Sequence, residues 1–99
     1  MNKVINVHEI ELVENPEGLK LFPNDVLERV EDQRVRLVNL DKATTLAKVS
    51  GTFANIVLNT QSGYKRIYAK VAGVDAGMVW IDGRIRIPIE AIYAIDLGN

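Results

Sequence analysis

The stretch that decides the fold is YKRIYAKVAGVDAGMVWIDGRIRIPIEAIYAID, residues 64–96. It is rich in β-branched and aromatic residues and is interrupted at short intervals by Asp and Gly, which is typical of strands joined by tight turns. We therefore predict an antiparallel meander of three strands over 64–74, 78–81 and 85–89. Pro88 has no amide hydrogen for a ladder, so the third strand should lie at a sheet edge.

The two faces of the first predicted strand differ in character. One face is mostly apolar and carries Lys65, Ile67, Ala69 and Val71; the other carries Tyr64, Arg66, Tyr68 and Lys70. On the second face, aromatic rings could stack on bases or aromatic ligands while the cations meet phosphate. The simpler interpretation is cross-strand packing of the tyrosines, shielded by the long cationic stems.

The environment of Trp80 depends on the length of the loop that begins at Asp82. A two-residue Asp-Gly loop would pair Trp80 with Ile85 and direct Trp80 into the core. A three-residue loop would leave Trp80 beside Arg86 on the opposite face, as an interface residue. Asp-Gly favours the first interpretation, which we prefer, whereas the cleaner separation of Val and Ile from Arg favours the second.

The remainder of the chain supplies further elements around this meander. An acidic capping box at Asp25 and Glu28 predicts one short helix over 25–32, lying across an open end of a sheet. We predict strands over 34–40 and 53–59, and a final strand or helical turn plus strand over 90–97. Residues 44–49 fit either a helix or a strand. Residues 1–14 suit an N-terminal arm or edge strand from Val4 to Val13, followed by a turn at 15–18.

Composition limits the functions that this chain can perform. The 99 residues fit a single domain over 1–99, and with 47% hydrophobic and 25% charged residues the chain should fold by itself. It holds no cysteine and one histidine, His8, so we expect no nucleophilic catalysis, no metal site and no cofactor. Without an apolar run long enough for a membrane span or a signal peptide, we expect a cytoplasmic protein with no membrane partner.

Charge is distributed unevenly along the chain although the net charge is only −1. Residues 9–32 hold eight acidic side chains against two basic ones, and residues 48–86 hold six basic against two acidic. The acidic stretch is most simply a solvated face that keeps an edge strand soluble. A recognition surface for anionic ligands is therefore expected on the later strands.

Residues 65–96 resemble the strand pattern of Sm-like and other SH3-type small β-barrels. The likeness lies in a bent strand ending in Gly73-Val74-Asp75, a tight turn, two short strands and a final step at 89–92. The family's mid-strand glycine is replaced by Ala69, and the motif of the Sm uridine pocket is absent after Asp75, so no RNA site is carried over. The resemblance implies a curved antiparallel sheet that closes into a barrel and often assembles into rings through edge strands.

The expected fold is mainly β, or α+β by strict count: a small, strongly bent antiparallel sheet or barrel with one short helix. The expected function is non-enzymatic binding or assembly, with homo-oligomers formed through an edge near Pro88 or Val4. The residues we select for binding are Tyr64, Arg66, Tyr68, Lys70, Trp80 and Arg86. Two alternatives remain: a nucleic-acid binder that uses the aromatic and basic face, and a small-molecule-binding barrel. A barrel this small should have its interior filled by side chains.

Overall fold

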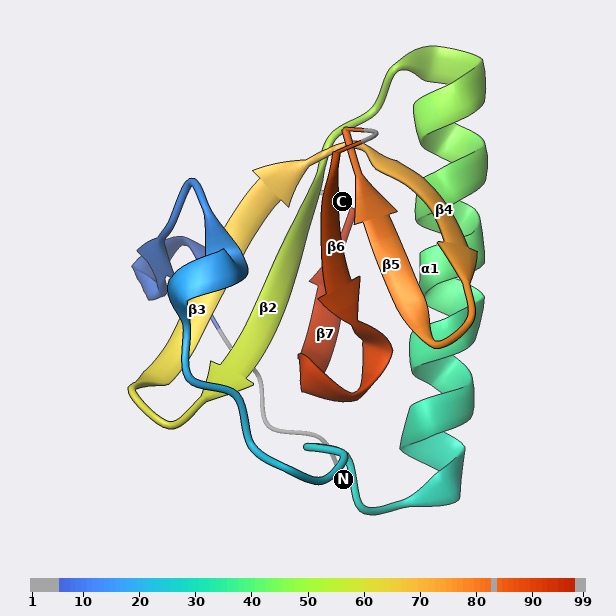
Figure 1. Ribbon diagram of the computed structural model, residues 1–99. Helices are drawn as coiled ribbons and strands as arrows, with labels where there is room; N and C mark the ends of the chain where they lie inside the picture. Colours follow the sequence, from blue (N-terminus) through green and yellow to red (C-terminus); the bar gives the residue numbers. More distant parts are fainter. Residues whose placement is uncertain (1–5, 83, 98–99) are drawn as a thin grey trace.

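Helix α1, Val30–Ser50, dominates one side of the computed structural model, which describes residues 6–82 and 84–97 (Figure 1). The predicted short helix over 25–32 and strand over 34–40 are both wrong, because α1 takes up residues 30–40 and continues to Ser50. Residues 44–49, whose sequence fits either a helix or a strand, are helical. The single helix is thus much longer than expected, and it begins later.

One narrow stripe attaches α1 to the rest of the fold. Arg36, Leu40 and Ala43 are its buried residues, and their spacing places them on one side of the helix. The helix ends at Gly51, whose backbone is left-handed with φ 66° and whose amide donates to Ala47 O at 3.0 Å. A glycine adopts this conformation without strain, so Gly51 ends the helix.

The segment before α1 is held by an Asx turn instead of the predicted helix cap. The Asp25 carboxylate accepts the Leu27 amide at 2.8 Å, two residues on, and does not cap Glu28. The cap position of α1 is Arg29, which makes no side-chain capping bond. Gln33 donates its side-chain amide to Leu27 O at 2.7 Å and so ties the first turn to this segment.

Seven strands form two sheets in the described part of the chain. The first sheet has the order β1-β3-β2-β7, with β1 at Glu11–Leu12, β3 at Gly63–Ala69, β2 at Ala54–Thr60 and β7 at Ile92–Asp96. Its pairs are antiparallel except β1 with β3, which is parallel. The second sheet is antiparallel, with the order β4-β5-β6 at Val71–Asp75, Met78–Ile81 and Ile85–Pro88.

Two connections link the sheets. The long strand predicted over 64–74 is divided at Lys70, so that β3 belongs to the first sheet and β4 to the second. The 3-10 helix η3, Ile89–Ala91, leads from β6 into β7, as the alternative of a helical turn plus strand anticipated. The result is a small α+β fold with two sheets and one α-helix. The described strands do not close into a barrel.

The core lies between the two sheets and is completed by α1. It is formed mainly by inward-facing aliphatic side chains of β2 to β7: Ile56, Leu58, Ile67, Val71, Val79, Ile81, Ile87 and Ile92. Leu40 and Ala43 join it from α1, and the N-terminal residues Val13, Leu19 and Leu21 pack against it. The predicted apolar face of the strand over 64–74 is confirmed, since Ile67, Ala69 and Val71 are all buried.

The register of β5 and β6 decides the position of Trp80. Ile81 pairs with Ile85 and Trp80 with Arg86, so the preferred two-residue loop is wrong and the three-residue loop is present. This register places Val79, Ile81 and Ile87 in the core together, whereas a two-residue loop would have paired Val79 with Arg86 and turned Trp80 inward. Asp82 adopts a left-handed φ of 53° at the start of the loop, and Gly83 lies outside the described residues.

The structure describes one of the two predicted sheet edges in full and part of the other. Pro88 lies on β6, which is an edge strand, as predicted. The N-terminal edge strand is reduced to β1, two residues long; 3-10 helices η1 (Val7–Glu9) and η2 (Pro16–Gly18) flank it, and Val4 lies outside the described residues. Within residues 6–82 and 84–97, no helix has both the length and the apolar character to cross a membrane.

Candidate functional site

The six residues selected from the sequence lie on two different sheets. Tyr64, Arg66 and Tyr68 belong to β3, and Lys70 follows that strand. Trp80 on β5 and Arg86 on β6 are cross-strand partners in the second sheet. Five of their side chains form three separate groups, and in two of these groups the partner, Phe53 or Tyr93, was not identified from the sequence.

The first group joins Tyr68, Lys70 and Phe53. The rings of Phe53 and Tyr68 stack with centroids 5.1 Å apart and an interplanar angle of 21°. The Lys70 ammonium lies 5.3 Å from the Phe53 centroid, within range of a cation–π interaction. All three side chains are exposed, so this cluster offers a flat aromatic surface with one cation beside it. We call it the Phe53 platform.

Lys70 also has a structural role in the Phe53 platform. Its Nζ would lie 3.8 Å from a Cβ built on Gly51, which places the ammonium beside the C-terminus of α1. The last carbonyls of a helix carry partial negative charge, so a cation at this position stabilises the helix end. The platform is therefore fixed to the helix as well as to the sheet.

The second group consists of tyrosines at the opposite end of β3. Tyr64 meets Tyr93 of β7 edge to face, with ring centroids 5.1 Å apart. Partial burial, followed by the proximity of Tyr93, raises the pKa of the Tyr64 hydroxyl above its ordinary value. Tyr64 thus presents a neutral hydroxyl group at physiological pH, not a charge.

Arg66, between these two aromatic groups, is occupied by internal hydrogen bonds. Its Nε donates to Ile10 O at 3.0 Å and its Nη1 to Asn55 Oδ1 at 3.0 Å. The neighbouring Lys65 pairs with Glu11 at 2.6 Å. Arg66 therefore anchors the N-terminal segment to the first sheet, and we no longer select it for ligand binding.

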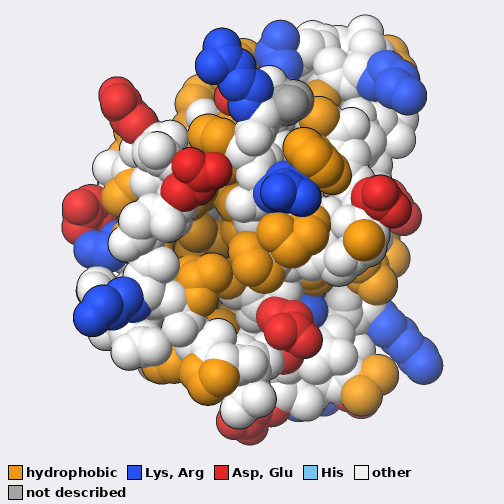
Figure 2. All heavy atoms as spheres, viewed as in Figure 1, with side chains coloured by type: hydrophobic (Ala, Val, Ile, Leu, Met, Phe, Trp, Pro, Cys, Tyr) orange, Lys and Arg blue, Asp and Glu red, His pale blue; other side chains and the backbone are white. Residues whose placement is uncertain are grey.

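The third group is the pair of Trp80 and Arg86. The Arg86 guanidinium lies 5.0 Å from the Trp80 ring centroid, on the face of the second sheet that points away from the core. Figure 2 shows hydrophobic side chains gathered over β5 and β6 around a basic side chain. A planar cation stacked on an indole is a common arrangement at protein interfaces.

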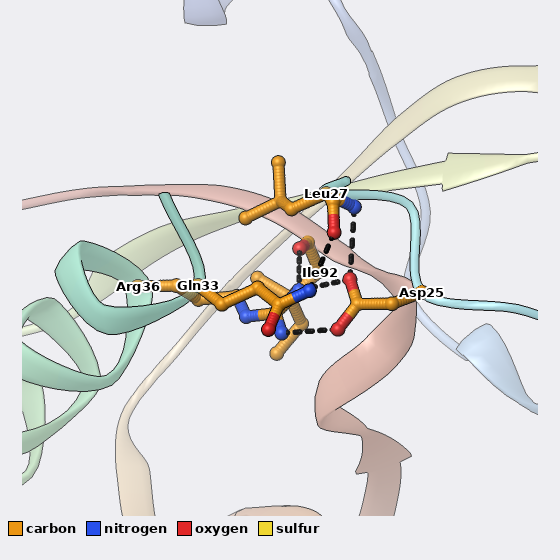
Figure 3. Close-up of polar contacts among 5 residues, drawn as sticks. All are labelled: Asp25, Leu27, Gln33, Arg36 and Ile92. Atoms are coloured by element: carbon orange, nitrogen blue, oxygen red, sulfur yellow. Dashed lines mark hydrogen bonds and ion pairs between the residues drawn. The ribbon is translucent and has the colours of Figure 1, made fainter. Parts of the chain in front are cut away.

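A buried ion pair, which the sequence analysis missed, joins Asp25 to Arg36 (Figure 3). Arg36 Nη1 donates to Asp25 Oδ1 at 2.8 Å and to Ile92 O at 2.9 Å, and Nη2 donates to Asp25 Oδ2 at 2.6 Å. These hydrogen bonds from Arg36 hold the pKa of the Asp25 carboxyl below its ordinary value; partial burial opposes them and the Leu27 amide adds to them. The pair connects the loop, α1 and β7.

A hollow of about 570 Å³ lies beside this ion pair. Its lining is largely apolar and includes Val26, Leu27, Val35, Val57 and Ala94, together with Arg36. Arg36 is only 5% exposed, and its Nε has no hydrogen-bond partner among the described residues. The hollow thus combines apolar walls with polar and charged side chains, among them Glu28, Arg29 and Asp32. This combination is typical of small-molecule sites.

The described part of the chain brings together no group of three or more side chains of the types that bind metals. His8 lies in η1 and is exposed. No family model, no curated protein and no solved structure matches this chain. The function must therefore be argued from the surfaces themselves.

Proposed function

We propose that this chain is a non-enzymatic binding and assembly module that associates with further copies through the free edge of β6. The observation that carries the proposal is the sheet order, which leaves β6 without a strand partner on one side, although the 3-10 helix η2 contacts part of this strand. An unpaired edge is a template for another strand unless it is blocked. The resemblance of residues 65–96 to small barrels that assemble through edge strands supports the same function.

The backbone of β6 shows which groups this edge offers. Ile89 donates to Gly77 O at 2.9 Å, and in an antiparallel ladder such bonds recur at every second residue. Ile85 and Ile87 therefore face β5, while Arg86 and Pro88 turn their backbone groups outward. Pro88 has no N–H, so the edge offers the amide of Arg86 and two carbonyls. With one amide and two carbonyls, the edge of β6 can form a short ladder with another strand but not a long one.

The best partner edge for β6 is β7 of a second copy. Two basic residues, Arg84 and Arg86, lie on or beside β6, whereas β7 ends in Asp96. Pairing β6 with itself would place like charges opposite each other, which is unfavourable. The first carbonyl of β7, Ile92 O, already accepts a hydrogen bond from Arg36. Pairing with β6 would therefore use the end of β7 near Asp96. Head-to-tail contacts of this kind generate rings or filaments.

A pair of substitutions at one position tests this proposal. Arg86→Pro removes the only outward amide of β6, whereas Arg86→Ala removes the same side chain and keeps the amide. We expect light scattering to give a mass above 11.0 kDa for the natural chain and for Arg86→Ala, and a lower mass for Arg86→Pro. Equal masses for the two variants, with circular dichroism showing both folded, would contradict strand pairing.

The Phe53 platform favours a second candidate function, binding of single-stranded nucleic acid. Exposed rings beside a cation can stack on bases while the ammonium meets a phosphate. Tyr68→Ala should then weaken binding of a fluorescent oligonucleotide by roughly tenfold, in line with the usual cost of losing one stacked base. Tyr64→Ala is the matched control. No binding by the natural chain at low salt would exclude this candidate.

The hollow beside Arg36 favours the small-molecule alternative. A compact ligand with an apolar body and a polar group that meets the charged side chains at the wall would fit its lining. Replacing Ala94 by Leu would fill part of the hollow and should abolish any thermal stabilisation seen with such a ligand. A ligand that stabilises the natural chain and this variant equally must bind elsewhere.

A further inference from the structure

A further, partly apolar surface lies on the outer side of α1 and shares only Val35 with the hollow beside Arg36. Its members recur at alternating spacings of three and four along the helix, which places them on one side. We call this surface the outer flank; it consists of Val35, Val38, Lys42, Thr45, Leu46 and Val49. Three valines of the outer flank are strongly exposed: Val35 by 55%, Val38 by 52% and Val49 by 76%.

The fold covers little of the outer flank, in which only Leu46 is half-buried. The helix meets the core through Arg36, Leu40 and Ala43, which lie on the side facing the sheets. In Figure 1, the outer side of α1 has no neighbouring element. Although Val30 and Leu37 are exposed elsewhere on the helix, Val35, Val38 and Val49 share one side of it, and exposed apolar side chains gathered in this way are typical of interaction surfaces.

We propose that the outer flank is covered by the outer flank of a second copy of this chain, with the two α1 helices antiparallel. The charges of the helix favour this occupant and this direction. Glu31 and Asp32 lie in the first turn and Lys48 in the last. Antiparallel packing brings the acidic end of each helix to the basic end of the other, and it opposes the two helix dipoles. Parallel packing would bring like charges together and align the dipoles.

The surface beside the outer flank has room for side chains of the partner. An open hollow of about 610 Å³ is bordered by Val38, Leu46 and Leu97, with Asp41 and Lys42 at its rim. A partner valine entering this hollow would cover Leu97 as well as the flank. With Val35 opposite Val49 of the partner, the two Lys42 side chains meet at the twofold axis, and Asp41 at the rim of each hollow supplies the opposite charge that offsets them.

A single helix side is smaller than a standard protein interface, so we expect a dimer with micromolar affinity. The contact between α1 helices and the pairing of β6 with β7 produce assemblies of different symmetry. The contact through α1 closes at two copies, whereas pairing of β6 with β7 is head to tail and continues. The two contacts use different residues and can be tested separately.

Chemical crosslinking tests both the contact and its direction. The natural chain has no cysteine, so each introduced cysteine is unique. With a short bismaleimide crosslinker, a mixture of Val35→Cys and Val49→Cys should yield crosslinked dimers at least tenfold faster than either variant alone. Crosslinking of each variant alone, as parallel helices would give, overturns the proposal. An absence of crosslinks in the mixture overturns it as well.

A charge substitution supplies an independent readout. Val38→Lys should raise the dimer dissociation constant at least tenfold in sedimentation equilibrium. Leu37→Lys is the matched control, because Leu37 is 46% exposed on the same helix but lies away from the outer flank. Equal effects of the two variants would overturn the proposal. Both measurements are made in the Arg86→Pro background, so that loss of strand pairing and loss of the helix contact are distinguished.

Discussion

Arg36 and Asp25 form a two-pronged ion pair, with Nη1 to Oδ1 at 2.8 Å and Nη2 to Oδ2 at 2.6 Å. The Arg36 side chain is 4% exposed and that of Asp25 is 20% exposed, so water screens the pair only weakly. Arg36 also donates to Ile92 O. One buried guanidinium therefore holds the loop before α1 to the first strand residue of β7.

Removing the carboxylate should be costly. Asp25→Ala leaves the charge of Arg36 buried without its partner, and breaking such a pair costs about 3 kcal/mol of unfolding free energy. Urea denaturation measures this loss. Glu11→Ala is the matched control: it breaks the exposed ion pair with Lys65 and should cost less than about 1 kcal/mol. Equal losses would show that the Asp25 pair contributes no more than a surface contact.

The same pair should make stability depend on acid pH. The pKa of Asp25 is lower in the folded chain than in the unfolded chain, where it is about 3.9. Its stabilising contribution is therefore complete above that value and disappears as the pH falls through the folded-state pKa. The unfolding free energy of the natural chain should fall more steeply below about pH 4 than that of Asp25→Asn. If the unfolding free energies of the two proteins fell equally with pH, a lowered pKa of Asp25 in the folded chain would be contradicted.

The glycine at the end of α1 gives a prediction about stability. Gly51 has a φ of 66°, and the nearest atom to a Cβ built there is Lys70 Nζ at 3.8 Å, so the cost of Ala is conformational, not steric. Gly51→Ala should reduce the free energy of unfolding, measured by urea denaturation, by about 1 kcal/mol. Gly18→Ala, at a glycine with no atom within 4 Å of such a Cβ and no left-handed φ, should be close to neutral.

Trp80 is the only tryptophan, so its fluorescence reports on the outer face of the second sheet. Arg86 covers part of its ring at 5.0 Å. Arg86→Ala should therefore increase quenching of Trp80 by acrylamide while changing stability by less than about 1 kcal/mol. A two-residue loop would have buried Trp80, and in that case quenching would be slight in both proteins.

The strands were predictable because their apolar residues alternate. Ile67, Ala69 and Val71 are buried where alternation places them. The predicted register of β5 and β6 was wrong because it followed the preference of Asp-Gly for two-residue loops. The separation of Val and Ile from Arg in the flanking residues favoured the observed register. Burial of Val79, Ile81 and Ile87 together decides the register, and this depends on packing across the whole core.

Helix α1 could not be identified from periodicity, for a physical reason. Its buried stripe contains Arg36, Leu40 and Ala43, of which only Leu40 is a large apolar residue. Its other apolar residues, Val35 and Val38 among them, are exposed. The apolar pattern of residues 34–40 therefore resembled a strand. The Asx turn of Asp25 used the same residue types as a helix cap and so misplaced the helix start.

The candidate site was only partly predictable. Tyr64, Tyr68, Lys70 and Arg86 are exposed aromatic or cationic residues, but Phe53 reaches Tyr68, and Tyr93 reaches Tyr64, from other elements. Such contacts between distant segments leave no local signal in the sequence. The ion pair of Asp25 with Arg36 escaped notice for the same reason.

Hydrogen exchange at the Arg86 amide is the most direct test of the assembly that we propose. This amide points away from β5, so it should exchange rapidly in a dilute monomer and slowly once another strand pairs with β6. We predict that its exchange slows at least about tenfold between dilute and concentrated samples, while the core amide of Val79 changes little. Equal exchange of the Arg86 amide at both concentrations would contradict strand pairing through β6.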